Sequence, residues 1–241
     1  MIAEPVHSYR AEGGCAVPLL SWTLPEPVLA ISSAVLGGGI GPRRWIVNAT
    51  VPMSYDRDDP ADHLREIAAE LQLSGPGIGL LTGVDVADVV VAEDEDVRLW
   101  ATVGLGAPVQ AAAPDVEVAS QPGVAPRAGT GTDVEVAPHA GTVNIVAWVP
   151  RRLSDGALVN AVATLTEAKT QAIRELGLDA TGTATDAVAV LCPLSGPEVD
   201  YAGPRSQWGR RLARAGHRAV LAGGAVNLSG LSSWSERRGD R

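Results

Sequence analysis

Two short stretches of this sequence combine residue types that can do chemistry. The first, residues 164–170, contains Lys169, and the second, residues 180–186, carries three threonines and ends in Asp186. Lys169 is the only lysine, and every other cation among the 19 basic residues is an arginine. Arginine replaces lysine at most solvated positions but cannot supply a compact ammonium that gives up its proton. The single lysine is therefore a candidate for catalysis or anion binding.

The helix expected around Lys169 determines where its ammonium points. Residues 154–176 contain no proline, and their apolar side chains recur at helical spacing. At about 100° per residue, Lys169 falls in the middle of the apolar stripe and Glu167 falls on the opposite face. Two interpretations are open. The lysine either extends along its own stem out of the core, or it points into a pocket as a functional group.

The stretch after this helix is predicted to be a polar turn that leads into a buried strand at 187–191. Thr181, Thr183 and Thr185 offer hydroxyl and backbone N–H groups to a polar ligand. The same groups can instead satisfy the backbone of the turn itself. By itself, the turn favours neither alternative.

Composition limits the classes of function. The chain has 241 residues, 46% of them apolar, with a formal net charge of −9, which argues against a nucleic-acid surface. It has no apolar run long enough for a membrane span and no signal-peptide pattern. Cys15 and Cys192 are isolated, so neither a disulfide framework nor a zinc site is indicated. We expect a soluble cytoplasmic protein that binds neither nucleic acid nor membrane; its oligomeric state is not predicted.

The remaining patterns predict a single α/β or α+β domain with helices packed on a mixed sheet. Pro18, Pro25 and Pro27 are expected to restrict the first 27 residues to short strands. The domain is predicted to span 1–228, with a poorly ordered Ala/Pro-rich insertion at about 108–139 and a disordered tail at 229–241. Strands are expected at 28–36, 44–51, 77–82, 88–91, 97–103, 141–149 and 187–191, and helices at 60–73, 154–176 and 207–221.

Two further features have competing interpretations. Gly37, Gly38 and Gly39 let a backbone approach a ligand closely, but they match neither a dinucleotide nor a phosphate-loop motif, and a flexible bend is an equal alternative. His63 shares a predicted helix with Glu66, without the order of a zinc-binding HExxH motif. For His63 we expect a solvated helix face, and we predict no metal site.

A weak internal repeat links two asparagines. Asn48 lies on a predicted strand that is followed by a helix and then a segment with a threonine. Asn144 begins a second series in the same order. This pattern suggests an internal β-α-β duplication, which would bring Asn48 and Asn144 to related places.

Four of these blocks, taken together, carry a resemblance to a known family. Residues 32–39, 141–144, 166–170 and 180–186 resemble, in order and spacing, the adenosylcobinamide amidohydrolase family (CbiZ). The resemblance runs from about residue 28 to 222, and the 108–139 segment is longer than the family usually has there. It implies a salvage enzyme that cleaves the amide joining aminopropanol to the corrin ring of adenosylcobinamide. The product, adenosylcobyric acid, re-enters coenzyme B12 synthesis.

Residue chemistry leaves two schemes for such a hydrolysis. In one, Ser32, Ser33 or a threonine of the 181–185 turn attacks as a nucleophile, with Lys169 as base. In the other, Glu167 or Asp186 activates water, and Lys169 stabilises the oxyanion. Predicted catalytic residues are Lys169, Asp186, Glu167 and Ser33, with Glu167 the least favoured; predicted substrate-binding residues are Ser32, Gly37, Gly38, Gly39, Asn48, Asn144, Thr181, Thr183 and Thr185.

The partner implied by the resemblance is a small-molecule corrinoid, and the cobalt belongs to that substrate. The sequence requires no separate cofactor. Two other classes of protein remain as alternatives. One is a non-catalytic corrinoid-binding carrier or sensor, and the other is an unrelated α/β amidase in which the lysine is structural.

Overall fold

A long mixed sheet organises the computed structural model, which describes residues 2–113, 141–230 and 233–238. Its strands follow the order β4-β3-β2-β10-β8-β6-β5, and β1 pairs with β2. The strands of this sheet are β1 (Val6–Glu12), β2 (Cys15–Ser32), β3 (Gly39–Thr50), β4 (Gly77–Thr82), β5 (Val90–Asp94), β6 (Val97–Val103), β8 (Val143–Trp148) and β10 (Ala187–Cys192). A small second sheet pairs β7 (Pro108–Val109) with β9 (Gly182–Thr183).

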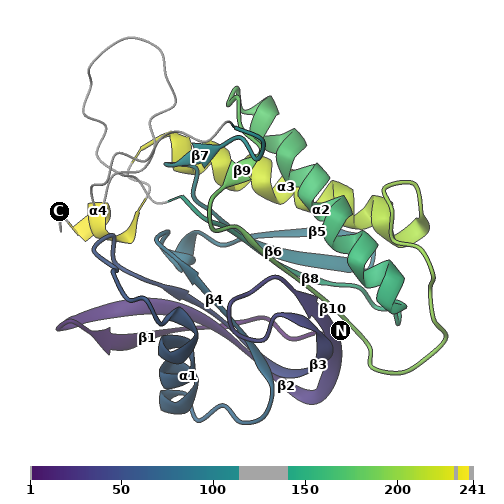
Figure 1. Ribbon diagram of the computed structural model, residues 1–241, viewed down its shortest axis with the longest axis horizontal. Helices are drawn as coiled ribbons and strands as arrows, with labels where there is room; N and C mark the ends of the chain where they lie inside the picture. Colours follow the sequence, from purple (N-terminus) through teal and green to yellow (C-terminus); the bar gives the residue numbers. More distant parts are fainter. Residues whose placement is uncertain (1, 114–140, 231–232, 239–241) are drawn as a thin grey trace.

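Helices cover the two ends of the sheet (Figure 1). The helices are α1 (Pro60–Glu70), α2 (Asp155–Glu175), α3 (Gln207–Leu228) and α4 (Trp234–Arg238), with a 3-10 turn at Val86–Asp88. Helices α2 and α3 pack together over β5, β6, β8 and β10, while α1 covers β3 and β4 at the other end of the sheet. The predicted single mixed α/β domain is thus confirmed.

Three apolar clusters hold these layers together. One lies between α2, α3 and the sheet, and a smaller one lies under α1. The third joins side chains of β2, β3 and β4 to side chains of β6, β8 and β10, and it includes Trp22, Trp100 and Trp148. The rings of Trp22 and Trp100 meet edge to face with centroids 5.8 Å apart. Because the sheet carries apolar side chains on both faces, its strands are buried from both sides.

Both predicted β-α-β units are present. Strands β3 and β4 are parallel and joined by α1, and strands β8 and β10 are parallel and joined by α2. Asn48 of β3 and Asn144 of β8 come together in the core, where the Asn144 Nδ2 donates to the Asn48 Oδ1 at 2.9 Å. The two asparagines lie on the corresponding strands of the two units, as the repeat predicts, but Asn48 is near the end of β3 and Asn144 near the start of β8.

The expectation of short strands near the N-terminus is wrong. Strand β2 runs for 18 residues through all three prolines. Pro25 and Pro27 lie where the pairing of β2 with β3 changes register between Thr23 and Val28. Pro18 precedes the first residue pair with β3. Proline is tolerated at such places because no ladder hydrogen bond needs its missing N–H.

The expectation of a disordered tail is also wrong for residues 233–238. Trp234 of α4 is only 6% exposed, and its backbone N–H donates to the Gly83 carbonyl at 3.2 Å. The Ser235 hydroxyl accepts from the Met53 N–H at 3.0 Å. One buried tryptophan holds this otherwise polar segment against the domain, and polar composition alone does not reveal such an anchor.

The predicted insertion at 108–139 is described only at its start. Residues 108–109 form β7, which pairs with β9 and so lies against the polar turn after α2. Residues 114–139 lie outside the described part of the chain. Among the described helices, none is long and apolar enough to cross a membrane.

Candidate active site

A cavity of about 520 Å³ gathers several of the predicted site residues. Its wall is formed by the end of β4, the loop before α1, the segment after β2 and the turn before β10. Ser33, Asn144, Thr185 and Asp186 all line it. The other lining residues are Ala34, Val35, Val51, Tyr55, Arg57, Pro60, Gly79, Leu80, Leu81, Thr82, Gly83, Thr142, Ala184 and Ala187. A cavity of this size and mixed polarity is typical of a small-molecule site.

Lys169 reaches the site through Asp186. Lys169 is 7% exposed, so its side chain does not extend out of the core. Its ammonium pairs with the Asp186 Oδ2, and the side chains of the two residues are 9% and 11% exposed. Lys169 is not among the residues that line the cavity. The lysine therefore positions a carboxylate at the cavity wall and does not itself face the cavity.

The carboxylate of Asp186 is fully occupied by protein donors. Its Oδ1 accepts from the Val143 N–H at 2.8 Å and from the Thr183 hydroxyl. Its Oδ2 accepts from the Thr183 N–H at 3.0 Å and from Lys169. A carboxylate offers about four acceptor positions. To accept a proton from water, Asp186 would first have to break one of these bonds.

Gly182 makes this close arrangement possible. A Cβ atom at this position would lie 2.4 Å from both the Asp186 Oδ2 and the Lys169 Nζ. No side chain fits there without displacing the ion pair. The glycine in the polar turn therefore serves the Lys169–Asp186 pair.

Asn144 lines the cavity and carries an unsatisfied buried acceptor. Its Nδ2 donates to the Leu81 carbonyl and to the Asn48 Oδ1, both at 2.9 Å. The amide cannot be turned over, because the Leu81 carbonyl can only accept. Among the described residues, the buried Asn144 Oδ1 has no hydrogen-bond partner. Such an atom is costly to bury unless a ligand or water donates to it.

Two predicted hydroxyl residues also line the cavity. The Ser33 Oγ accepts from the Val188 N–H at 3.0 Å, which leaves its own hydrogen available. The Thr185 Oγ1 lies 2.7 Å from the Thr142 Oγ1 and 3.3 Å from the Gly141 carbonyl oxygen. Both hydroxyls can therefore contact a ligand in the cavity.

Other predicted residues support the site from outside the cavity. Asn48 orients Asn144, and Thr183 orients Asp186. Thr181 ties the turn to β7, since its N–H donates to the Val109 carbonyl at 2.9 Å. The Ser32 Oγ is buried and accepts from the Ala34 N–H at 3.0 Å.

The glycine run lies elsewhere. None of Gly37, Gly38 and Gly39 lines the cavity. Gly37 has a φ of +75°, and a Cβ there would lie 1.9 Å from the Gly77 carbonyl oxygen. The Arg43 guanidinium donates to the Gly37 carbonyl at 2.9 Å. The run is therefore a fixed turn against β4, outside the cavity, and not a flexible bend.

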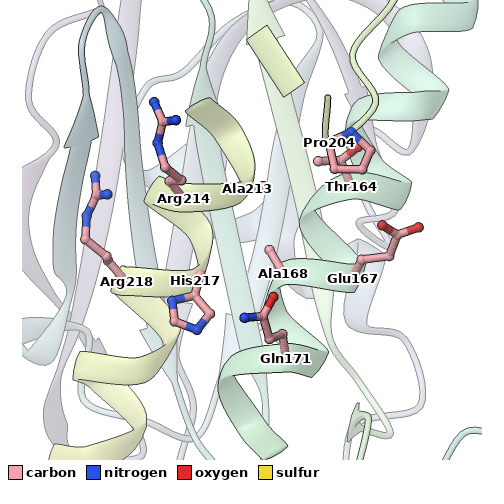
Figure 2. Close-up of a pocket in the computed structure, with 9 residues that line it drawn as sticks. All are labelled: Thr164, Glu167, Ala168, Gln171, Pro204, Ala213, Arg214, His217 and Arg218. Atoms are coloured by element: carbon pink, nitrogen blue, oxygen red, sulfur yellow. The ribbon is translucent and has the colours of Figure 1, made fainter. Parts of the chain in front are cut away.

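Glu167 lies in a different place from the Lys169–Asp186 pair. It is exposed and lines a separate groove between α2 and α3, together with Gln171, Arg214, His217 and others (Figure 2). It does not line the cavity that holds Asp186. The structure thus gives no support to a direct role for Glu167 in that cavity.

Sequence reasoning missed the contribution of the loop before α1. Tyr55 and Arg57 from this loop line the cavity, and Tyr55 bonds to His63 of α1. The expectation of a solvated His63 is wrong, since this residue is 6% exposed. The signal that could have revealed it is the position of His63 one residue before Leu64, at the edge of the apolar stripe of α1.

Burial changes the ionisation of both Tyr55 and His63. Desolvation raises the pKa of Tyr55 and lowers the pKa of His63, an effect that the nearby Glu12 carboxylate opposes. Both side chains are therefore neutral near pH 7. Within residues 2–113, 141–230 and 233–238, no group of three or more His, Cys, Asp or Glu side chains is placed to hold a metal ion.

Comparisons with known proteins identify the family of this chain. The model of the family described as adenosylcobinamide amidohydrolase, CbiZ, matches residues 3–230. The chain belongs to this family. It is 31% identical over 200 residues to an adenosylcobinamide amidohydrolase of Methanosarcina mazei, covering 79% of this chain and 88% of that protein. It is 36% identical over 175 residues to one of Halobacterium salinarum, covering 72% of this chain and 70% of that protein.

A structural comparison gives a weaker similarity. A crystal structure of the PH0078 protein from Pyrococcus horikoshii OT3 aligns with a TM-score of 0.44 and 11% sequence identity, covering 91% of this chain and 83% of that one. A score of this size supports no conclusion about function. Family membership therefore rests on sequence.

Proposed function

We propose that this protein hydrolyses the amide that joins aminopropanol to the corrin ring of adenosylcobinamide, which yields adenosylcobyric acid. The observation that carries the proposal is the family match across residues 3–230, which includes every residue that lines the cavity. Membership makes the protein an amidohydrolase, and the linear amide bond of adenosylcobinamide is the substrate that this family's name implies. The cobalt of the corrinoid belongs to the substrate.

The cavity suits the amide arm of such a substrate. A volume of about 520 Å³ can take the aminopropanol arm, while the corrin ring would remain at the cavity mouth. A secondary amide has one N–H that needs an acceptor on binding. The unpartnered Asn144 Oδ1 is buried, and it would accept this hydrogen bond once the side chain turns toward the amide arm, which would also offset the cost of burying that oxygen.

For the chemical step we favour the attack of water, activated by a group other than those of the two schemes. Lys169 is committed to Asp186 and does not line the cavity, so it is poorly placed to deprotonate Ser33. Asp186 has no acceptor position left for a water molecule, and Glu167 lies in another groove. In this proposal Lys169 and Asp186 fix the wall of the site, and Ser33 and Thr185 contact the substrate.

The test is to incubate the protein with adenosylcobinamide and to measure free aminopropanol and adenosylcobyric acid. We expect both products in equal amounts, and no cleavage of small aliphatic amides that lack the ring. Binding of the corrinoid, seen as a change in its visible spectrum, without release of aminopropanol would identify a carrier or sensor instead. Comparable turnover of a generic amide would favour an unrelated amidase.

The variant Asn144→Ala tests whether the cavity binds the amide arm of the substrate. Removing the acceptor should raise the KM for adenosylcobinamide, because the buried N–H of the amide would then have no partner. Asn227→Ala is a matched control, since Asn227 is also a buried asparagine but does not line the cavity. An unchanged KM in Asn144→Ala would contradict the proposed binding of the amide arm.

A further inference from the structure

Three side chains that line the cavity can ionise, and two of them are already engaged. The lining residues of this kind are Tyr55, Arg57 and Asp186. Arg57 makes a two-point contact with Asp59, both bonds at 2.7 Å, and also bonds to Glu66 at 2.6 Å. Asp186 is saturated by its own donors. Tyr55 is the remaining lining residue that can exchange a proton with a substrate.

Behind Tyr55 stands a histidine with a carboxylate on its far side. The Tyr55 hydroxyl lies 3.1 Å from the His63 Nδ1, and the two rings are stacked with centroids 5.5 Å apart. The His63 Nε2 lies 3.7 Å from a carboxylate oxygen of Glu12. Glu12 is in turn held by buried Arg10, which also donates to the Thr50 carbonyl at 2.7 Å.

The position of Glu12 favours one direction for the hydrogen bond. A carboxylate only accepts, so its place on the Nε2 side of neutral His63 favours the tautomer that carries its hydrogen on Nε2. The Nδ1 is then an acceptor, and the Tyr55 hydroxyl donates to it. The lone pairs of the phenol oxygen remain available to a hydrogen from the cavity.

We propose that Tyr55 transfers the protons of the hydrolysis and that His63, positioned by Glu12, receives and returns them through Tyr55. The inference rests on the proposed function, because it assigns a role in that reaction. Tyr55 is the residue that meets the substrate, whereas His63 and Glu12 act through it. None of the three belongs to the catalytic residues predicted from sequence.

The proton transfers balance as follows. Water attacks the amide carbon; one of its protons goes to the phenol oxygen, whose own proton goes to the His63 Nδ1. The resulting imidazolium is stabilised by the Glu12 carboxylate. When the C–N bond breaks, the proton returns from His63 through Tyr55 to the leaving nitrogen. The products are the corrin carboxylic acid and aminopropanol, which then equilibrate with solvent.

The charges around His63 suit this relay. Glu12 and Glu66 favour its protonated form, while Arg10 and Arg57 oppose it, and burial is the largest effect and lowers its pKa. Tyr55 contributes a neutral ring from the loop before α1. His63 is therefore unprotonated at neutral pH and ready to accept a proton, which is the state that a general base requires.

The first experiment compares Tyr55→Phe with Tyr201→Phe in the full chain, with release of aminopropanol from adenosylcobinamide as the readout. Tyr201 is 73% exposed and does not line the cavity, so Tyr201→Phe should keep the wild-type rate. Tyr55→Phe keeps the ring but removes the hydroxyl, and kcat should fall by about 10²–10⁴-fold. Its KM and thermal melting temperature should stay close to those of the wild type.

The second experiment uses pH to separate the relay from simple structure. Wild-type kcat/KM should fall as pH drops and His63 becomes protonated. His63→Gln should lower kcat and remove this acidic limb. His217→Gln should keep the limb, because His217 pairs with Glu175 at 2.8 Å in the other groove.

These experiments distinguish the relay from the proposed function. A wild-type protein that releases no aminopropanol would overturn the function, and the relay with it. A wild-type protein that is active while Tyr55→Phe is equally active would overturn the relay alone. A rise in KM with unchanged kcat in Tyr55→Phe would also overturn it, because the phenol would then serve binding. Retention of the acidic limb in His63→Gln would remove His63 from the relay.

Discussion

Each of the two β-α-β units buries one ionisable side chain on its helix, and the two side chains differ in their hydrogen-bond surroundings. Lys169 of α2 is 7% exposed and His63 of α1 is 6% exposed. Lys169 meets a carboxylate that accepts from four donors in all, so its surroundings are complete. His63 has a hydrogen bond to Tyr55 and a 3.7 Å approach to Glu12, which is longer than a hydrogen bond.

The difference indicates what each residue does. A buried ion pair with every position filled resists change, and it holds the turn before β10 in one arrangement. A buried histidine with a neutral partner can change its protonation at little structural cost. We therefore expect the Lys169 unit to determine stability and the His63 unit to determine the response to pH.

The largest expected effect comes from Lys169→Met. The sequence alone permits the view that methionine would improve an apolar stripe, but the structure reverses that expectation because Asp186 would be left buried without its cation. Breaking a buried pair in this way costs about 3–5 kcal/mol. Urea unfolding should show this loss, and adding Asp186→Asn should recover part of it. Equal stability of Lys169→Met and the wild type would contradict the comparison.

Gly182→Ala tests the same pair through its backbone. The new Cβ would lie 2.4 Å from the Asp186 Oδ2 and the Lys169 Nζ. Overpacking of this kind costs about 1–3 kcal/mol. Gly156→Ala in the first turn of α2 is the control, since a Cβ there meets nothing within 4 Å. The control should unfold at the wild-type urea concentration or above it, and a similar loss in both variants would show that the ion pair is not the cause.

The pH dependence of stability tests the His63 unit. Burial lowers the pKa of folded His63 below the unfolded value of 6.5. As pH falls through that value, the unfolded chain binds a proton more readily than the folded one, so stability is lost. The urea midpoint of the wild type should therefore drop between pH 7.5 and 5.5 by more than that of His63→Gln. If the urea midpoints of the wild type and of His63→Gln change in parallel with pH, His63 has the same pKa in the folded and unfolded states.

The smallest expected effect belongs to Glu167→Gln. Glu167 is exposed and lies outside the cavity, so neither the rate of aminopropanol release nor the urea midpoint should change measurably. A large loss of activity would show that part of the reaction depends on the groove between α2 and α3. That groove would then be a third functional region, in addition to the two units compared above.

Local patterns in the sequence were sufficient for helix α2 and for the burial of Lys169. The apolar spacing of 154–176 predicts α2 within one residue at each end, and it places Lys169 among its buried residues. The repeat also places Asn48 and Asn144 on corresponding strands of the two units. These features depend on periodicity within one element or on the order of elements, and both can be read along the chain.

Only the tertiary structure decided which polar side chains have all their hydrogen-bond positions filled and which can still exchange a proton. Asp186 takes one of its donors from Val143, 43 residues earlier, because β8 and β10 pair in parallel. Glu12 reaches His63 because β1 extends the sheet beside β2, which pairs with β3 and so lies near α1. Hydrophobic periodicity states which face of an element is buried, but not which residue of a distant strand it meets. That depends on strand register, which the packing of the whole sheet determines.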